Sequence, residues 1–163
     1  MVVADSSALI PLARVGRLDL ISALFDTVHT TEDVQEEVIT EGQPGTSALA
    51  SFLDGVMIHE RPSRAKELSS LEGIATADAS VVLIADTEDE SLLANDKGLI
   101  EVARSHGINC WWVTTVLLGC VRDGILTADE ATDVLYELVN KGMNLDPKIY
   151  TKVQRKLGDL GET

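Results

Sequence analysis

The chain has 163 residues, long enough for one domain with a sizeable core, and 45% of them are hydrophobic while only 4% are aromatic. Its 27 acidic and 13 basic residues give a formal net charge of −14 at pH 7. Taken alone, this charge argues against a nucleic-acid partner, because phosphate binding normally needs a basic surface. Carboxylates gathered around bound cations, or a high-salt habitat, would each reconcile the charge with a phosphate ligand.

We expect a cytoplasmic protein without a membrane segment. No apolar run exceeds about ten residues, which excludes a membrane span, and the first apolar run lacks the basic residues that precede it in a signal peptide. The two cysteines, Cys110 and Cys120, lie among apolar residues and have no metal-ligand spacing to the three histidines. We therefore expect both to be reduced.

The N-terminal run Val2–Ala4 predicts a buried parallel strand, because it is short, apolar and rich in valine. It stops at Asp5, and Ser6 and Ser7 then open a helical pattern, since serine is a favourable helix N-cap. Asp5 is thus expected at the carboxyl edge of a sheet, where α/β proteins bind ligands. The alternative is that Asp5 only assists the helix cap.

The next segment alternates helical and β-prone patterns. Its expected elements are helices over 18–25, 32–39 and 46–53, and short strands over 27–30 and 56–59. Thr31 is the expected N-cap of the second helix, in which Val34 and Val38 mark the buried stripe. Glu37 stands beside that stripe, and Glu36 stands further round the helix.

A nearly all-apolar helix is expected over Ala77–Ala85, with Thr76 as its N-cap. A charged segment over 61–72, with a short helix in it, precedes this helix. Asp78 lies in the first turn, where the helix dipole stabilises an anion; acids are common there, so a purely structural role is an equal alternative. The acidic run over 86–90 is expected to be a solvated loop.

The C-terminal half continues the alternation and then becomes helical. The expected elements are strands over 91–94 and 110–113 and helices over 97–104, 116–122, 127–141 and from 146 onward. Asn95 and Asp96 follow the first of these strands, and Thr114 or Thr115 caps the helix over 116–122. Alternating strands and helices predict one α/β domain over 1–163, with a parallel-sheet core over 1–125 and a helical extension over 127–160.

Four acids, Asp5, Glu37, Asp78 and Asp96, could share one crevice if their strands are neighbours where the strand order reverses. Two unit charges about 5 Å apart in an effective dielectric near 20 repel by roughly 3 kcal/mol. Six such pairs approach about 20 kcal/mol, more than the about 5–15 kcal/mol that stabilises a typical domain. The acids must therefore hold protons or cations, and oxygen ligands without nearby His or Cys suit Mg²⁺ or Mn²⁺ rather than zinc.

Taken together, these residues resemble the PIN domain family, in particular the VapC-type ribonuclease toxins and related archaeal PIN proteins. The match covers residues 1–121 and rests on Asp5-Ser6 after a strand, Glu37 before an apolar residue, Asp78 within Thr76–Ala79, and Asn95-Asp96 after a strand. The resemblance implies a three-layer α/β fold with a central parallel sheet of about five strands, helices on both faces and extra C-terminal helices.

The resemblance also implies metal-dependent cleavage of RNA at two Mg²⁺ or Mn²⁺ ions. By the resemblance, the residues that would ligate metal are Asp5, Asp78, Asp96 and Glu37. Glu37 could instead position the attacking water. Those that would orient the carboxylates are Ser6, Asn95 and Thr115. Glu36 is the alternative to Glu37, because a sequence pattern sets helix phase only to within a residue or two.

Three partners are expected: an RNA substrate, an antitoxin protein and a second copy of the chain in a dimer. The basic residues best placed for phosphate are Arg14, Arg17, Lys97 and Arg104. The alternatives to a ribonuclease are an inactive PIN-like module that binds protein or RNA, a phosphatase or phosphotransfer domain with Asp5 as nucleophile, and a plain α/β domain with scattered surface acids. Two Mg²⁺ would bring the net charge only to about −10, which keeps the inactive module open.

Overall fold

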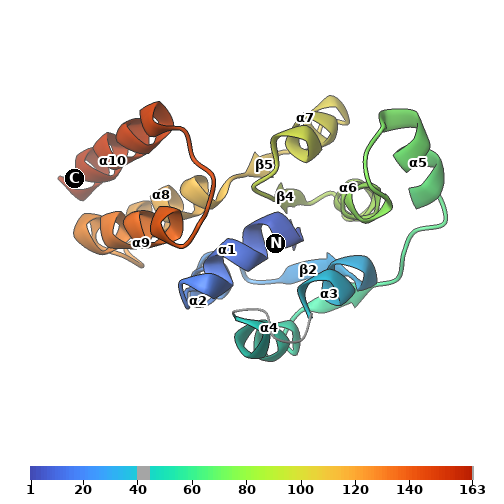
Figure 1. Ribbon diagram of the computed structural model, residues 1–163, viewed down its shortest axis with the longest axis horizontal. Coiled ribbons are helices and arrows are strands. Elements are labelled where there is room, and N and C mark those ends of the chain that lie inside the picture. Colours follow the sequence, from blue (N-terminus) through green and yellow to red (C-terminus); the bar gives the residue numbers. More distant parts are fainter. Residues whose placement is uncertain (40–44, 163) are drawn as a thin grey trace.

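The computed structural model describes residues 1–39 and 45–162. Its centre is a parallel sheet of five strands in the order β3-β2-β1-β4-β5 (Figure 1). The strands are β1 (Val2–Ala4), β2 (Val28–Thr31), β3 (Met57–His59), β4 (Ser91–Leu93) and β5 (Cys110–Trp111). This sheet confirms the expected α/β fold.

Helices connect the strands and extend the chain beyond the sheet. They are α1 (Ser6–Arg14), α2 (Asp19–Leu24), α3 (Glu32–Val38), α4 (Thr46–Leu53), α5 (Ala65–Glu72), α6 (Thr76–Glu88), α7 (Lys97–Ser105), α8 (Val113–Arg122), α9 (Ala128–Asn140) and α10 (Pro147–Gly161). No single helix among the described residues is long and apolar enough to span a membrane, and α5 and α6 reach that length and hydropathy only together, across a bend of 112°.

The central strand β1 is buried completely, since Val2, Val3 and Ala4 are all 0% exposed. Val3 pairs with His29 of β2 on one side and with Leu92 of β4 on the other. The chain builds the sheet outward from β1 to β3 and then returns to place β4 on the other side of β1. The strand order therefore reverses between β1 and β4, and their carboxyl ends flank the crevice where such sheets bind ligands.

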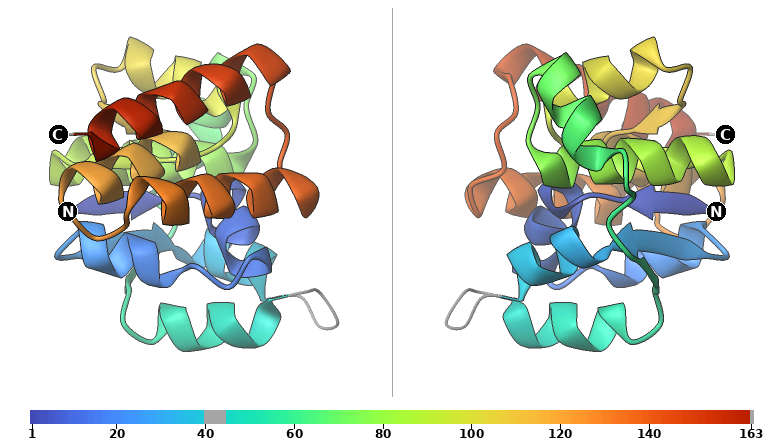
Figure 2. Two further views of the ribbon diagram at one scale, coloured as in Figure 1. Left: turned by 90° about the vertical axis from the view of Figure 1, so that its left-hand side faces the viewer. Right: turned by 90° about the vertical axis from the view of Figure 1, so that its right-hand side faces the viewer.

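Helices cover both faces of the sheet. α6 packs across β1, β2 and β4, with α5 and α7 beside it, while α1, α2 and α8 lie on the opposite side (Figure 1). α3 contacts both α1 and α6, so it passes over the carboxyl edge between the two helical layers. The view of Figure 1 looks onto this edge, because β1 runs from the N-terminus toward the side that faces the viewer (Figure 2).

The last three helices form a layer of their own. α10 packs on α8 and α9, and α9 contacts α1. The end of α10 approaches the start of α9 so closely that a Cβ atom at Gly161 would lie 2.5 Å from Ala128 Cβ. The predicted helical extension is therefore an ordered layer against the core.

Three expectations about element boundaries are wrong, two of them at α6 and one between β5 and α8. The acidic run over 86–90 was expected to be a loop, but α6 continues through its first three residues to Glu88. The helix ends at its C-cap, Asp89, which has φ +54°. Residues 81, 82, 84 and 85 are buried on this helix, and their packing outweighs the unfavourable placement of acids near a helix C-terminus. The N-cap of α6 is Ala75, so Thr76 is its first residue rather than its cap.

The other difference concerns β5, which ends at Trp111 rather than at residue 113. α8 begins at Val113 with Trp112 as its N-cap, so Thr114 and Thr115 lie inside its first turn instead of before it. The Thr115 hydroxyl still serves the helix terminus, because it accepts the backbone N–H of Trp112 at 3.3 Å. Val113 is fully buried, which favours a helical residue facing the core over an edge-strand residue.

Candidate metal centre

Asp5 is a buried N-cap with one oxygen left over. It follows β1 directly and caps α1, where its Oδ2 accepts the backbone N–H of Ser7 at 3.1 Å and the Ser7 hydroxyl at 2.6 Å. The side chain is 2% exposed, and its Oδ1 is buried without a hydrogen-bond partner among the described residues. The helix cap thus accounts for one carboxylate oxygen, and the other is available to a ligand.

Ser7 ties the ends of the two central strands together. Its hydroxyl donates to Asp5 and accepts the backbone N–H of Asn95, which follows β4, at 2.8 Å. The Asp5 N–H in turn donates to the Leu93 carbonyl at 2.9 Å. This bridge fixes the Asp5 carboxylate at the point where the strand order reverses.

The supporting contacts therefore differ from those expected at Ser6, Asn95 and Thr115. The Ser6 backbone makes only the smallest contribution to the pKa of Asp5, and Asn95 contributes a backbone N–H to Ser7. The Thr115 hydroxyl caps α8, and within residues 1–39 and 45–162 it bonds to none of the four acids. Ser7 was missed because two adjacent serines look alike until the helix phase is known.

The pKa of Asp5 is raised above its ordinary value, chiefly because burial penalises the charged form. The hydrogen bonds from Ser7 lower this pKa, and the nearby charge of Glu37 raises it again. A buried carboxylate that repels another acid is costly without a proton or a cation.

Asp78 shows that the four acids act on one another. It lies half-buried in the first turn of α6, and its pKa is raised to about 6. Burial is the largest cause, and the charges of Asp5, Asp96 and Glu37 follow in that order. The acids at the N-caps of α1 and α7, on α3 and in the first turn of α6 are thus close enough for their charges to raise the pKa of Asp78.

Asp96 repeats the position of Asp5 one strand along the sheet. It follows β4 and caps α7, where its Oδ1 accepts the backbone N–H of Leu99 at 3.0 Å. Unlike Asp5, it is exposed to solvent. Since β1 and β4 are paired in parallel, the two carboxylates emerge at neighbouring strand ends.

Glu37, rather than Glu36, faces this group. Glu37 raises the pKa of both Asp5 and Asp78, so its charge lies on the crevice side of α3. Glu36 acts instead on Arg61, whose pKa is raised chiefly by its hydrogen bonds to Asp33 and less by the Glu36 charge. The two adjacent glutamates therefore point to different surroundings.

The donor set fits a hard divalent cation. All four groups are carboxylates, and the buried Asp5 Oδ1 lacks any other partner among the described residues. In the described part of the chain no three His, Cys, Asp or Glu side chains stand close enough to enclose an ion by themselves. Mg²⁺ retains several waters and binds through one or two carboxylates plus substrate phosphates, so an open group of acids suits it.

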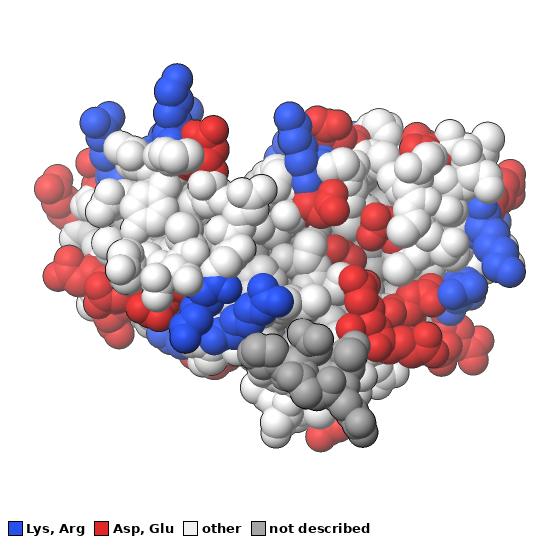
Figure 3. All heavy atoms as spheres, in the orientation of Figure 1, with Lys and Arg blue, Asp and Glu red and all other residues white. Residues whose placement is uncertain are grey.

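Acidic side chains are concentrated near the strand ends. Figure 3 shows them at the centre and lower right of the face that carries the strand ends, over α3 and α6, with further acids at the left margin and Lys and Arg side chains toward both the left and the right. Without cations, this concentration of acids repels phosphate.

Comparisons with known proteins agree with the fold. A family model described as DUF3368, PIN domain, matches residues 1–159. PAE2754 from Pyrobaculum aerophilum has a similar structure, with 20% identity, a TM-score of 0.56, and coverage of 71% of this chain and 92% of that one. The PilT N-terminus domain protein SSO1118 from the hyperthermophilic archaeon Sulfolobus solfataricus P2 is also similar, with 17% identity, a TM-score of 0.52, and coverage of 71% of this chain and 88% of that one.

The structural matches, at such low identity, show the fold alone, and the curated proteins give no match. The family model, in contrast, spans nearly the whole chain and carries the family assignment. It confirms the resemblance to this family and agrees with the five-stranded parallel sheet. The chain belongs to the PIN domain family, whose members are generally nucleases.

Proposed function

We propose that this protein is a metal-dependent endoribonuclease that hydrolyses RNA phosphodiester bonds at Asp5, Asp78, Asp96 and Glu37. The observation that carries the proposal is the Asp5 Oδ1, which is buried and has no partner among the described residues. It belongs to a group in which the pKa of Asp78 rises to about 6 through burial and three neighbouring negative charges. A divalent cation is the ligand that relieves both features at once.

Asp5, Asp78 and Asp96 would hold Mg²⁺ or Mn²⁺, and Glu37 would hold a metal or orient the attacking water. When bound, such ions generate a nucleophilic water at neutral pH and stabilise the leaving oxygen of a phosphodiester. The protein's own contribution is placement, because Ser7 holds Asp5 against the end of β4 and the N-caps of α1 and α7 fix Asp5 and Asp96.

The helix termini support a phosphate ligand at the same place. α1, α6 and α7 all begin beside these acids, and a helix N-terminus carries a partial positive charge with free backbone N–H groups. Asp5 and Asp96 use some of these N–H groups as caps, so the dipoles favour the carboxylates and an incoming phosphate alike. RNA, rather than DNA, is proposed from the resemblance to the VapC-type toxins.

A toxin role, with an antitoxin as inhibitory partner, is a finer form of the same proposal. An RNA-cleaving protein that is toxic to its own cell needs a tight inhibitor, and the acidic crevice would be the surface to block. The net charge of −14 favours the alternative of an inactive PIN-like binding module, because it opposes RNA binding. Retention of all four acids favours the ribonuclease.

The test is cleavage of a labelled single-stranded RNA by the purified chain in Mg²⁺ or Mn²⁺, with EDTA as the metal-free control. Asp78→Asn should abolish cleavage, whereas Asp86→Asn, on the same helix but outside the group, should retain it. Cleavage that persists in EDTA or in Asp78→Asn would refute the proposed site. Absence of cleavage across varied RNAs and salt concentrations would favour the inactive binding module.

A further inference from the structure

α10 is a basic helix in an acidic chain. Four of the 13 Lys and Arg residues lie on it, at Lys148, Lys152, Arg155 and Lys156, with Asp159 as its one acid in the described range. Its net charge is therefore +3, and the remainder of the chain has −17. Such a separation concentrates attraction for anions on one surface.

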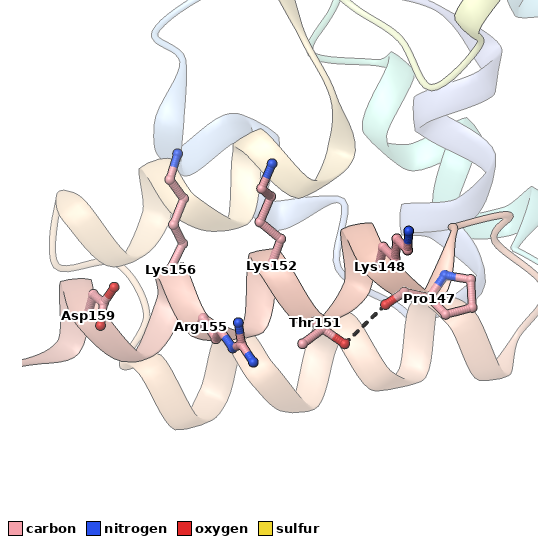
Figure 4. Close-up of a pocket in the computed structure, with 7 residues that line it drawn as sticks. All are labelled: Pro147, Lys148, Thr151, Lys152, Arg155, Lys156 and Asp159. Atoms are coloured by element: carbon pink, nitrogen blue, oxygen red, sulfur yellow. Dashed lines mark hydrogen bonds between the residues drawn. The ribbon is translucent and has the colours of Figure 1, made fainter.

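The four basic side chains share one face of α10. Their spacing places them at i, i+4, i+7 and i+8, on the side opposite the buried Val153 and Leu157. All four are exposed and line a shallow hollow of about 580 Å³ together with Pro147, Thr151 and Asp159 (Figure 4). The ion pairs of residues 1–39 and 45–162 include none of the four. Their charges are thus open to an external ligand.

The two tyrosines of the chain lie at one flank of this basic face, and Tyr150 is half-buried against the core. Tyr136 of α9 and Tyr150 of α10 line a second hollow of about 680 Å³, which shares Pro147 and Thr151 with the first. Tyr136 is 58% exposed. Aromatic rings beside a row of cations are the elements with which proteins hold single-stranded nucleic acids, through base stacking and phosphate contacts.

We propose that this surface, the α9–α10 face, binds single-stranded RNA. Its phosphate-binding residues are Lys148, Lys152, Arg155 and Lys156, and its base-stacking residue is the exposed Tyr136. The inference rests on the proposed function and names where the substrate strand would dock outside the acidic crevice. It also answers the objection from net charge, because RNA would meet a basic surface first.

The geometry suits a strand of a few nucleotides. The eight residue steps from Lys148 to Lys156 rise about 12 Å along the helix. One stacked strand presents three to four phosphates over about that length, at about 3.4 Å each. The start of α10 lies on the side of the molecule toward which β1 runs (Figure 2), which is the side of the acidic crevice. A strand held at α10 can therefore continue toward the strand ends.

The experiment measures binding of a fluorescent 12-nucleotide mixed-sequence RNA by anisotropy in EDTA, so that metal-dependent cleavage does not intervene. Lys152→Gln/Lys156→Gln removes two charges from the α9–α10 face. Arg64→Gln/Lys66→Gln removes two charges from α5 and is the matched control. Each lost phosphate contact lowers the slope of log K against log salt by about 0.7, so the first variant should lower it by about 1.4 and weaken binding about 25-fold at 0.1 M salt.

The control should bind within two-fold of the unmodified chain, and circular dichroism should show that both double variants melt as it does. Tyr136→Leu, which keeps an apolar side chain, should weaken binding about five-fold or more by loss of stacking. Equal affinity and slope in Lys152→Gln/Lys156→Gln and in the control would overturn the proposal. If polyglutamate competes with RNA and Tyr136→Leu has no effect on RNA affinity, RNA binding is overturned in favour of an acidic protein partner.

A dimer that Lys152→Gln/Lys156→Gln dissociates, with RNA affinity unchanged, would assign the face to a second copy instead. The outcome is separable from that of the proposed function. RNA binding at the α9–α10 face without cleavage in any metal would refute the ribonuclease and leave this inference intact. Metal-dependent cleavage with undiminished RNA affinity in Lys152→Gln/Lys156→Gln would support the ribonuclease and refute RNA binding at the α9–α10 face.

Discussion

Removing one negative charge from the acidic group should stabilise the metal-free protein, and Asp78→Asn is the sharpest such change. The pKa of Asp78 is about 6 in the folded protein against an ordinary 3.8, with burial as the main cause and the other three acids adding to it. Since the folded-state pKa is the higher one, the ionised carboxylate destabilises the fold above about pH 6. The cost falls as pH decreases and vanishes below the unfolded pKa of 3.8.

The size of the effect follows from that difference. A shift of about two pKa units corresponds to about 3 kcal/mol at most. Asp78 is only half-buried, so solvent screening reduces the figure, and the dipole of α6 stabilises the charged form by about 0.3–1 kcal/mol. About 1–2 kcal/mol remains, which at about 2–4 °C per kcal/mol predicts a rise in the melting temperature of about 2–8 °C.

The assay is thermal unfolding by circular dichroism in EDTA at pH 7.5 and pH 4.5. Asp78→Asn should melt above the unmodified chain at pH 7.5 and close to it at pH 4.5. Asp86→Asn, on the same helix, controls for the general effect of removing one acid from a chain of charge −14. A melting temperature that is unchanged or lower at pH 7.5, or a gain equal to that of Asp86→Asn, would show that the four acids do not strain one another.

Three further outcomes are expected. Mg²⁺ or Mn²⁺ at 100-fold above its Kd should stabilise the fold by about 2.7 kcal/mol, and thermal unfolding should show this gain lost in Asp5→Asn. Ser7→Ala should lower the free energy of unfolding in urea by about 1–3 kcal/mol, because it opens the bridge between the central strand ends, while Ser6→Ala should cost less; equal losses would contradict the bridge. Glu37→Gln should reduce RNA cleavage at least ten-fold and Glu36→Gln should not, and the opposite ranking would reverse the assignment on α3.

The acids were predictable because each belongs to a local pattern that also fixes its position. Asp5 and Asp96 follow short apolar strands, and a strand end that becomes a helix start lies at the carboxyl edge of a parallel sheet. Asp78 stands out as the one charge at the start of an apolar helix. The pairing of β1 with β4 was left as a condition by the sequence, and the structure meets it, so Asp5 and Asp96 emerge at neighbouring strand ends.

The contacts that depend on exact helix phase were not predictable. Ser6 and Ser7 are equivalent in sequence, and only the N-cap at Asp5 decides that the Ser7 hydroxyl faces Asn95. The end of α6 was missed for a different reason, since acids at a helix C-terminus are locally unfavourable and burial of the helix overrides them. The first turn of α8 was missed because Val113 suits a strand as well as a helix.

Metal binding by the four acids is tested most directly by an anomalous difference map from crystals soaked in Mn²⁺. A peak is expected within coordination distance of the Asp5 Oδ1, between the carboxylates of Asp78 and Asp96, and it should be absent from crystals of Asp5→Asn. Mn²⁺ ordered only elsewhere on the molecule, with the Asp5 Oδ1 bound to a protein group instead, would contradict metal binding at this site.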